Sequence, residues 1–223
     1  MGAILRVGDG RGFVVTCQGH LGNKERIVIT AAHCLPYLPR CHSGRYLHEY
    51  TYRRLLGPLG GKRTVWAECV FVDAMADIAV LGSPDNQELS DQAEAYDQLV
   101  DSMKPLAVAD APAQGSEQLT FGDHQVSNPT PGKGPARVFS LKGRWLKGQV
   151  FRLGGWLNFE PGKHVVGGMS GSAIIDATGS AIGVVSCGST LGETTNPVIV
   201  DCLSARLVQS ILASQANSDT SEI

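Results

Sequence analysis

The sequence predicts an all-β protein with two added helices. Its 223 residues include 27 glycines and 11 prolines, spread along the chain, which indicates many turns. Apolar residues make up 43% and charged residues 18%, a balance that suits a compact globular protein. The apolar runs are short, as at residues 27–29 and 173–175, which is typical of buried strands. The length suits one large domain or two small domains that share a cleft.

The first half of the chain predicts several strands, two of which lie next to His33 and Asp77. The β-prone residues 12–16 are followed by a polar turn and by a returning apolar run at residues 27–30, which predicts a hairpin. This hairpin brings His33 to the end of a strand, where a short helical turn begins. Residues 64–73 form a further predicted strand, and Asp77 heads the next one.

Two segments in the middle of the chain leave alternatives open. Residues 36–63 are rich in basic and tyrosine side chains, which can contact phosphates, although we expect a solvated loop or edge strands here. Residues 85–103 place apolar side chains at helical spacing opposite an acidic face, which predicts an amphipathic helix. This helix either covers a sheet edge or docks a regulatory protein partner or larger complex. Its acidic residues are Asp85, Glu88, Asp91, Glu94, Asp97 and Asp101.

Short apolar runs in the second half predict a second set of strands. The expected strands are residues 105–109, 116–121, 137–141, 149–153, 182–187 and 198–200. Residues 201–215 predict a terminal helix with Asp201 as its N-cap. Its inward-facing residues are expected to be Leu203, Leu207, Ile211 and Leu212. The polar residues 216–223 are expected to be disordered.

Three motifs carry a histidine, an aspartate and a serine in that order. Beside His33 and Asp77, Ser170 lies in the glycine-hinged turn at residues 168–173. A serine hydroxyl is a weak nucleophile unless a base takes its proton, so Ser170 depends on its partners. The order His, Asp, Ser belongs to one of the convergent catalytic triads.

With these motifs and the run Gly-Val-Val-Ser-Cys-Gly-Ser at residues 183–189, the chain resembles the trypsin-like serine proteases of the chymotrypsin fold. The resemblance extends from about residue 12 to about residue 212 and is strongest toward the intracellular bacterial type. It implies two six-stranded antiparallel β-barrels with the active site in the cleft between them, an inserted linker helix and a C-terminal helix. The implied division is residues 1–84 for the first barrel, 85–105 for the acidic helical linker, 106–203 for the second barrel, and 204–223 for the C-terminal helix and disordered tail.

The resemblance also implies a role for each triad residue. His33 is the expected general base for Ser170, and Asp77 is expected to orient the imidazole. Asp73 competes for the aspartate position, but the family's aspartate heads the run that begins at Asp77. The backbone amides of Gly168 and Ser170 are the expected oxyanion-hole donors.

Substrate-binding residues follow from the same resemblance. His164 lies six residues before the nucleophile, at the expected pocket floor, where it could hydrogen-bond an acidic or amide side chain; a plain loop histidine is the alternative. Val198 is expected on the opposite wall. Ser186, Cys187 and Gly188 belong to the strand that is expected beside bound peptide.

Met169 departs from the family pattern. Secreted relatives have an aspartate immediately before the serine and fold a new amino terminus onto it, whereas this chain has a methionine there. That route of zymogen activation is therefore not expected. The enzyme is either formed constitutively, like many intracellular bacterial relatives, or switched in another way.

Cysteine usage leaves two possibilities open. Secreted relatives close the histidine loop with a disulfide, for which Cys34 is well placed and Cys17 is a candidate partner. A reducing cytoplasm favours free thiols, which we expect. Cys34, Cys41 and His42 lack a fourth ligand for zinc at sensible spacing.

Composition bounds the partners and the location. The net charge of −2 gives no pull toward nucleic acid or membrane, and neither a secretory signal nor a membrane-spanning run is evident. We therefore expect a cytoplasmic protein without metal or cofactor, acting on protein or peptide substrates. An α/β-hydrolase is disfavoured because Ser172 stands where its motif needs glycine and no histidine follows Ser170. A subtilisin-type order would require Asp9.

The sequence thus predicts a serine endopeptidase. The alternative is a protease-fold interaction module whose turnover is controlled by a partner and which has little free activity.

Overall fold

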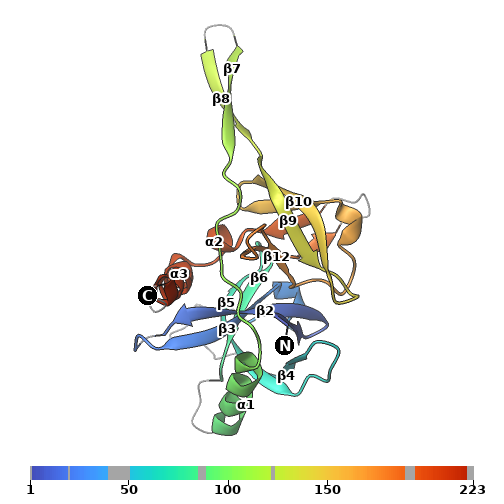
Figure 1. Ribbon diagram of the computed structural model, residues 1–223, viewed down its shortest axis with the longest axis vertical. Helices are drawn as coiled ribbons and strands as arrows, with labels where there is room; N and C mark the ends of the chain where they lie inside the picture. Colours follow the sequence, from blue (N-terminus) through green and yellow to red (C-terminus); the bar gives the residue numbers. More distant parts are fainter. Residues whose placement is uncertain are drawn as a thin grey trace.

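The structure is a computed structural model that describes residues 2–19, 21–39, 51–84, 89–121, 124–188 and 194–219. Figure 1 shows two β-barrels one above the other, with a helix below the first barrel and a long hairpin projecting beyond the second. No helix in the described ranges is long and apolar enough to cross a membrane.

The first barrel is closed by six antiparallel strands. The strand order is β1-β2-β3-β6-β5-β4. The strands are β1 (Ile4–Val7), β2 (Gly10–Gln18), β3 (Lys24–Thr30), β4 (Thr51–Pro58), β5 (Val65–Asp73) and β6 (Ile78–Gly82). Successive strands bury side chains on a shared face, as with Val14, Val28 and Leu81, which the register pairs across β2, β3 and β6, because alternate residues of a strand face the same side.

The basic, tyrosine-bearing stretch supplies part of this barrel. The hydroxyl of Tyr52, a buried residue of β4, donates to the carbonyl oxygen of Tyr37 at 2.9 Å. The guanidinium of Arg53 lies 5.0 Å from the centre of the Trp66 ring. Part of the stretch is therefore a strand of the first barrel, as expected, but β4 pairs with both β1 and β5 and is not an edge strand. Residues 40–50 lie outside the described part of the chain.

Helix α1 (Ser90–Asp101) covers the first barrel. The hydroxyl of Tyr96, which is 1% exposed, donates to the carbonyl oxygen of Leu81 at 3.0 Å. Arg26 of β3 donates to the carbonyl oxygens of Val100 and Met103 at 2.8 and 3.0 Å and so caps the helix C-terminus. The predicted helix is present, and its exposed face carries Asp91, Glu94, Asp97 and Asp101. Asp85 and Glu88 lie outside the described residues.

The hairpin between the two barrels corrects one prediction. Residues 116–121 do form a strand, but β7 (Gly115–Phe121) pairs with β8 (His124–Thr130) in a separate two-stranded sheet that projects from the body. Side chains of β8 are almost all exposed, so this segment has no apolar face to bury in a barrel. Residues 105–109 also form no ladder; single bridges join Leu106 to Val15 and Val108 to Ala181.

The second barrel is a nearly closed seven-stranded sheet rather than a six-stranded one. Its order is β13-β12-β9-β10-β11-β15-β14, and a bridge from Gly183 to Val198 brings its edges together. Buried apolar residues such as Val138, Leu157 and Ile182 fill its interior. The strands are β9 (Gly132–Phe139), β10 (Trp145–Leu153), β11 (Trp156–Glu160), β12 (Ala173–Ile175), β13 (Ala181–Val184), β14 (Cys187–Gly188) and β15 (Thr194–Pro197).

Two helices end the described chain, where one was predicted. The predicted strand at residues 198–200 runs into α2 (Ile199–Cys202), and α3 (Ala205–Asp219) follows. Asp201 is therefore not an N-cap; it lies inside α2, and its carboxylate accepts from Arg152 at 2.8 Å. The separation arises because Leu203 is extended.

Helix α3 packs on β2 largely with the expected face, since Ile211 and the preceding Leu203 are buried and Leu207 packs against the core. Ile211 and Ser214 are buried, and the Ser214 hydroxyl donates to the carbonyl oxygen of Thr16 at 2.8 Å. Leu212 is 43% exposed, so its predicted inward orientation is wrong. Residues 216–219 are helical rather than disordered, and residues 220–223 lie outside the described part.

Candidate active site

His33 stands at the mouth of the first barrel. Strand β3 ends at Thr30, and His33 follows in a short 3-10 turn, η1 (Ala32–Cys34). Its Nδ1 lies 2.7 Å from Oδ2 of Asp77, and its backbone N–H donates to Oδ1 of the same carboxylate at 2.9 Å. With Nδ1 as the donor, Nε2 keeps a lone pair that can accept a proton.

Asp77, and not Asp73, faces the histidine. Asp77 immediately precedes β6 with a left-handed backbone, φ 54°, which is uncommon for a residue other than glycine. Its carbonyl oxygen accepts from Ala32 at 3.2 Å, so the two motifs are joined through backbone as well. The carboxylate of Asp73 is engaged elsewhere, because its Oδ1 accepts from the N–H groups of Met75 and Ala76 at 2.9 Å each.

Each member of this pair shifts the pKa of the other. The hydrogen bond to Asp77 raises the pKa of His33 above its ordinary value of 6.5, although partial burial opposes the shift. Burial by itself raises the pKa of Asp77, but the hydrogen bonds from His33 and Ser186 outweigh it and hold the pKa below its ordinary value. The site therefore favours a carboxylate beside an imidazole that readily holds a proton.

The turn that carries Ser170 is locked between the two barrels. Gly168 and Gly171 have φ values of 83° and 81°, which are left-handed and favour glycine. A Cβ on Gly171 would lie 1.8 Å from the carbonyl oxygen of Arg11. The backbone N–H of Arg11 donates to the carbonyl oxygen of Ser170 at 2.8 Å, and the N–H of Gly171 donates to Val185 at 2.7 Å. These contacts fix the serine against β2 of the first barrel.

Ser186 connects the serine to the aspartate. The hydroxyl of Ser170 donates to the carbonyl oxygen of Ser186 at 3.4 Å, and the hydroxyl of Ser186 donates to Oδ2 of Asp77. No direct hydrogen bond joins Ser170 to His33 within the described residues. The sequence placed Ser186 beside bound peptide; its side chain instead contacts the carboxylate that also binds His33.

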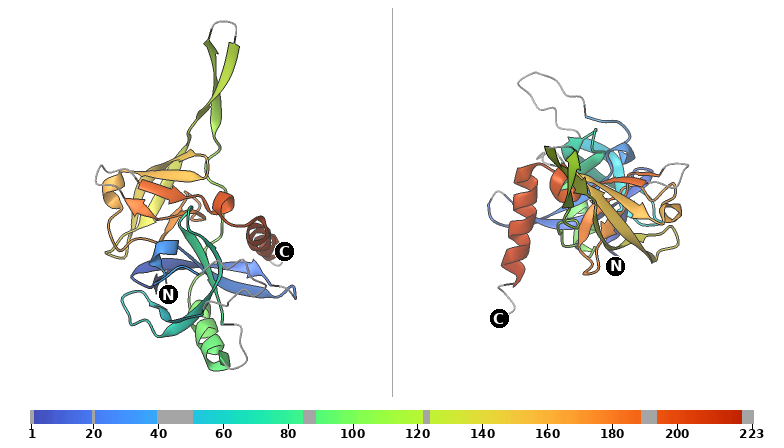
Figure 2. Two further views of the ribbon diagram at one scale, coloured as in Figure 1. Left: turned by 180° about the vertical axis from the view of Figure 1, so that it is seen from behind. Right: turned by 90° about the horizontal axis from the view of Figure 1, so that it is seen from above.

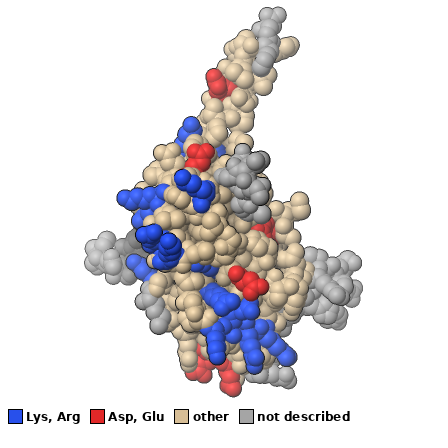
Figure 3. All heavy atoms as spheres, turned by 90° about the vertical axis from the view of Figure 1, so that its right-hand side faces the viewer, with Lys and Arg blue, Asp and Glu red and all other residues tan. Residues whose placement is uncertain are grey.

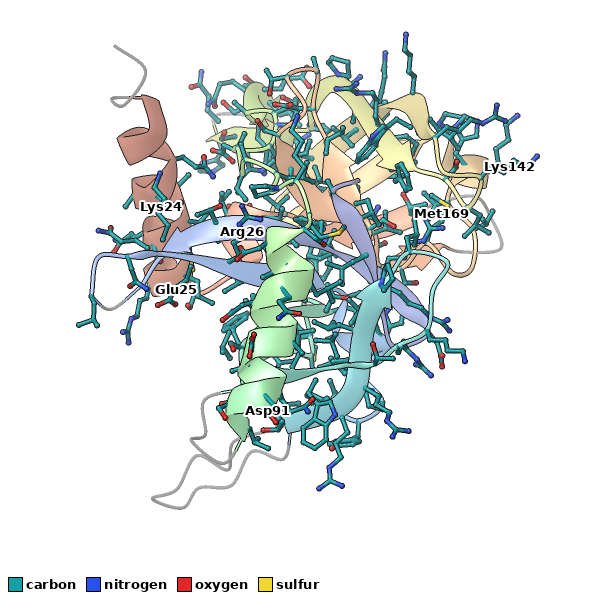
Figure 4. The ribbon with its side chains drawn as sticks, turned by 60° about the horizontal axis from the view of Figure 1, so that its bottom comes forward. Lys24, Glu25, Arg26, Asp91, Lys142 and Met169 are labelled. Atoms are coloured by element: carbon teal, nitrogen blue, oxygen red, sulfur yellow. The ribbon has the colours of Figure 1, made fainter. Side chains whose placement is uncertain are left out.

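The two backbone amides that the resemblance implies as oxyanion-hole donors lie on either side of Met169. The N–H groups of Gly168 and Ser170 have no hydrogen-bond partner within the described part of the chain, and Gly168 is exposed. Met169, between them, is fully buried in the second barrel's core, and its N–H donates to Val166 at 3.2 Å. Figure 4 shows Met169 on the same side of the molecule as Lys142. An apolar anchor thus holds the turn where secreted relatives are expected to use an ion pair.

The predicted substrate-binding residues are only partly accessible. His164 ends the 3-10 turn η3 (Gly162–His164), and its Nδ1 is buried without a hydrogen-bond partner in the described structure. Val198 is fully buried in the second core and donates its N–H to Gly155 at 2.8 Å, so its side chain is covered. Cys187 and Gly188 form β14, which pairs with β15.

Cys17 and Cys34 are unpaired, as expected, and the alternative of a disulfide between them is wrong. The residue facing Cys34 is Gly10, where an added Cβ would lie 2.3 Å from the Cys34 sulfur. Burial raises the pKa of both thiols, which keeps them protonated and unreactive. The described residues contain no cluster suited to a metal ion, and Cys41 and His42 lie outside them.

Arg11 is a structural part of the site that sequence reasoning missed. Its guanidinium is 6% exposed and donates to the carbonyl oxygens of Phe139 and Ser140 at 3.1 Å each. Its carbonyl oxygen accepts from the hydroxyl of Thr30 at 2.6 Å. One residue thereby ties β2 to both the end of β9 and the serine turn. The only signal in the sequence was a charged residue between two glycines.

Comparison with known proteins agrees with this geometry. A family model described as a trypsin-like peptidase domain matches residues 10–184. No curated protein matches the chain. The serine protease domain of the Sesbania mosaic virus polyprotein is similar in structure, with a TM-score of 0.53, 12% identity, and coverage of 91% of this chain and 93% of that chain. A second similar structure is described for the coupled folding and binding of the intrinsically disordered VPg protein of Sesbania mosaic virus. It has a TM-score of 0.51 and 13% identity, and the match covers 90% of this chain and 88% of the other. These likenesses show a shared fold.

Proposed function

Because this chain belongs to the trypsin-like peptidase domain family, we propose that it is a serine endopeptidase acting through His33, Asp77 and Ser170. The observation that carries the proposal is the use of both Asp77 oxygens. One oxygen accepts from the His33 backbone, and the other accepts from the His33 ring and from Ser186. Such an arrangement fixes the ring and leaves Nε2 available as a base.

In the proposed reaction, the Ser170 oxygen attacks the carbonyl carbon of a peptide bond while Nε2 of His33 takes the hydroxyl proton. Proton transfer of this kind contributes about 10²- to 10⁴-fold to the rate. The C–N bond then breaks, and His33 gives the proton to the leaving amine. An acyl-enzyme remains on Ser170, and water hydrolyses it with His33 again as the base.

The remaining groups stabilise charge along this path. The amides of Gly168 and Ser170 are proposed to donate to the oxyanion, and losing one such donor typically costs about 10²- to 10³-fold. Asp77 stabilises the imidazolium and holds the ring in the right tautomer. The Ser170 hydroxyl is proposed to turn from the Ser186 carbonyl toward His33 when substrate binds, since catalytic hydrogen bonds are often long or unformed without substrate.

Constitutive formation of the site is supported by Met169. The buried thioether and the contacts of Gly171 hold the serine turn without an ion pair from a new amino terminus. We therefore propose that no zymogen cleavage is needed.

Hydrolysis of an unfolded protein tests the proposed function. Wild type is expected to release new amino termini, and Ser170→Ala is expected to lose turnover by about 10⁶-fold, because the triad acts as a unit. Unchanged melting of Ser170→Ala shows that the loss is chemical. Retained hydrolysis by this variant refutes the proposed nucleophile.

A further inference from the structure

Basic side chains lie on or beside two turns that border the serine turn: Lys142 and Arg144 lie on the β9–β10 turn, whereas Lys62 and Arg63 come from the β4–β5 connection. The β1–β2 turn is bound by Arg63, whose Nη1 lies 3.2 Å from Oδ1 of Asp9, with Lys62 next to it in the chain. The β9–β10 turn, residues 140–144, carries Lys142 and Arg144. We call Lys62, Arg63, Lys142 and Arg144 the basic rim. Figure 3 shows lysine and arginine side chains gathered over both barrels on one face of the molecule.

Each turn contacts the serine turn directly. A Cβ on Gly10, one residue after Asp9, would lie 2.7 Å from the carbonyl oxygen of Ser170. A Cβ on Gly168 would lie 3.5 Å from Cδ2 of Leu141, one residue before Lys142. The basic rim therefore approaches the serine turn from both barrels. Lys142 and Arg144 lie on the turn that meets Gly168, and Arg63, with Lys62 beside it in the chain, binds Asp9 next to Gly10.

The rim's positive charge is largely uncompensated. Within the described residues, Lys62, Lys142 and Arg144 make no ion pair, and the partner of Arg63, Asp9, is 95% exposed in its side chain. Glu160 is the one acid in residues 133–163, a segment that carries seven lysines and arginines. Four of the chain's 21 acidic residues lie instead on α1, at the far end of the first barrel.

A cleft bordered by one sign of charge concentrates ligands of the opposite sign and raises their association rate. We propose that the basic rim selects peptide substrates that carry aspartate or glutamate within a few residues of the scissile bond. This preference rests on the proposed endopeptidase function, and it adds the chemical class of the substrate. Peptide is favoured over nucleic acid because the rim borders the proposed peptidase centre and the chain's net charge is −2.

Cleavage-site profiling is the first part of the test. A mixture of peptides from denatured proteins is digested, and the new termini are mapped by mass spectrometry. Acidic residues are expected to be enriched beside the cleaved bonds. Two fluorogenic peptides are then built on the best site, one with its acidic residues and one with the matching amides. We expect kcat/KM to be about 10-fold higher for the acidic peptide near 0.05 M salt and to converge with the amide peptide near 0.5 M, because screening shortens the range of the rim's field.

Charge reversal on the rim is the second part. The variant Lys62→Glu/Lys142→Glu is expected to remove or invert the ratio of the two kcat/KM values. The matched control is Lys24→Glu/Arg206→Glu, which changes the net charge by the same amount. Its residues line the hollow between the β2–β3 hairpin and α3. In this control, the ratio of kcat/KM for the acidic peptide to kcat/KM for the amide peptide is expected to match wild type. Figure 4 shows Lys24 and Lys142 on opposite sides of the molecule.

The outcomes separate the two proposals. Equal kcat/KM for the acidic and amide peptides in wild type refutes the substrate preference and leaves the endopeptidase proposal standing. If the rim variant still prefers the acidic peptide, the assignment to the rim is refuted. The same holds if the control variant also loses this preference. No cleavage of any peptide refutes the endopeptidase proposal and the preference with it. Rim-dependent binding of a single-stranded oligonucleotide, without a peptide preference, assigns the rim to nucleic acid instead.

Discussion

The hydroxyl of Ser186 donates to Oδ2 of Asp77, the same oxygen that lies 2.7 Å from Nδ1 of His33. Ser186→Ala removes this donor and leaves the carboxylate a stronger base. A hydrogen bond to a charged group contributes about 1.5–3 kcal/mol, so we expect turnover to fall roughly 10-fold and the pH midpoint of activity to rise. A pH series of kcat/KM measures both. An unchanged profile shows that the contact does not tune the site.

Asp77→Asn and Asp73→Asn should differ greatly. An amide at position 77 favours the wrong tautomer of His33, and a loss of about 10⁴-fold in kcat is expected. An amide at position 73 keeps a carbonyl oxygen that can accept from Met75 and Ala76, so its effect should be small. Steady-state kinetics of both variants on one peptide decide the matter. Equal losses contradict the assignment of Asp77.

Activity should rise with pH through a midpoint above 6.5, because His33 must lose its proton to act as a base and Asp77 raises its pKa. The contribution of His33 to the free energy of unfolding should instead fall as pH rises. The raised pKa of His33 contributes stability that is present below about pH 6.5 and is lost as pH rises through the folded-state pKa.

The lowered pKa of Asp77 contributes stability above about pH 3.8 that is lost as pH falls through its folded-state pKa. Urea unfolding of wild type and Asp77→Asn at several pH values measures these contributions. The wild-type advantage should be larger at pH 5 than at pH 9. An advantage that grows on the alkaline side contradicts the His33–Asp77 linkage.

Gly171→Ala should destabilise the protein much more than Gly143→Ala. Both glycines are left-handed, which costs a residue with a Cβ about 1–2 kcal/mol. Only at Gly171 does the added Cβ meet backbone, 1.8 Å from the Arg11 carbonyl oxygen, whereas nothing lies within 4 Å at Gly143. Thermal melting compares the two variants. Similar melting temperatures contradict the tight docking of the serine turn.

Ser172→Ala is the matched control for the nucleophile. The Ser172 side chain is fully buried, and its hydroxyl has no hydrogen-bond partner in the described structure. Removing an unsatisfied buried hydroxyl is expected to leave the melting temperature unchanged or raise it, with turnover retained. A large loss of turnover in this variant means that the proposed register of the serine motif is wrong.

Local patterns predicted most elements of the first barrel because its strands combine apolar alternation with clear turns, as in β2 and β3. The first strand of the β7–β8 hairpin was predicted as a strand but was placed in the wrong sheet. A β-prone segment predicts a strand, whereas the exposed side chains of the hairpin in the structure show that it lies outside the barrel. Asp201 is not a cap because the helix begins two residues earlier, at Ile199, and the Asp201 carboxylate pairs with Arg152, which is far away in the chain.

In the site, too, residues in local motifs could be predicted from the sequence, whereas contacts between distant segments could not. His33, Asp77 and Ser170 were found because each sits in a recognisable motif, and the structure brings the first two into contact. The contacts of Arg11 with Phe139 and of Gly10 with Cys34 join segments far apart in the chain. No local pattern encodes such pairs, so Arg11 and Gly10 were not recognised as parts of the site.

Covalent labelling with a fluorophosphonate tests the central claim most directly, because the reagent forms a stable phosphorus–oxygen bond with an activated serine. Peptide mapping by mass spectrometry should find the adduct on Ser170 in wild type. Labelling should be absent in Ser170→Ala, strongly reduced in Asp77→Asn and unchanged in Ser172→Ala. No adduct on the folded wild-type protein, or an adduct on another serine that persists in Ser170→Ala, would contradict the proposal that Ser170 is the nucleophile of a His33–Asp77–Ser170 triad.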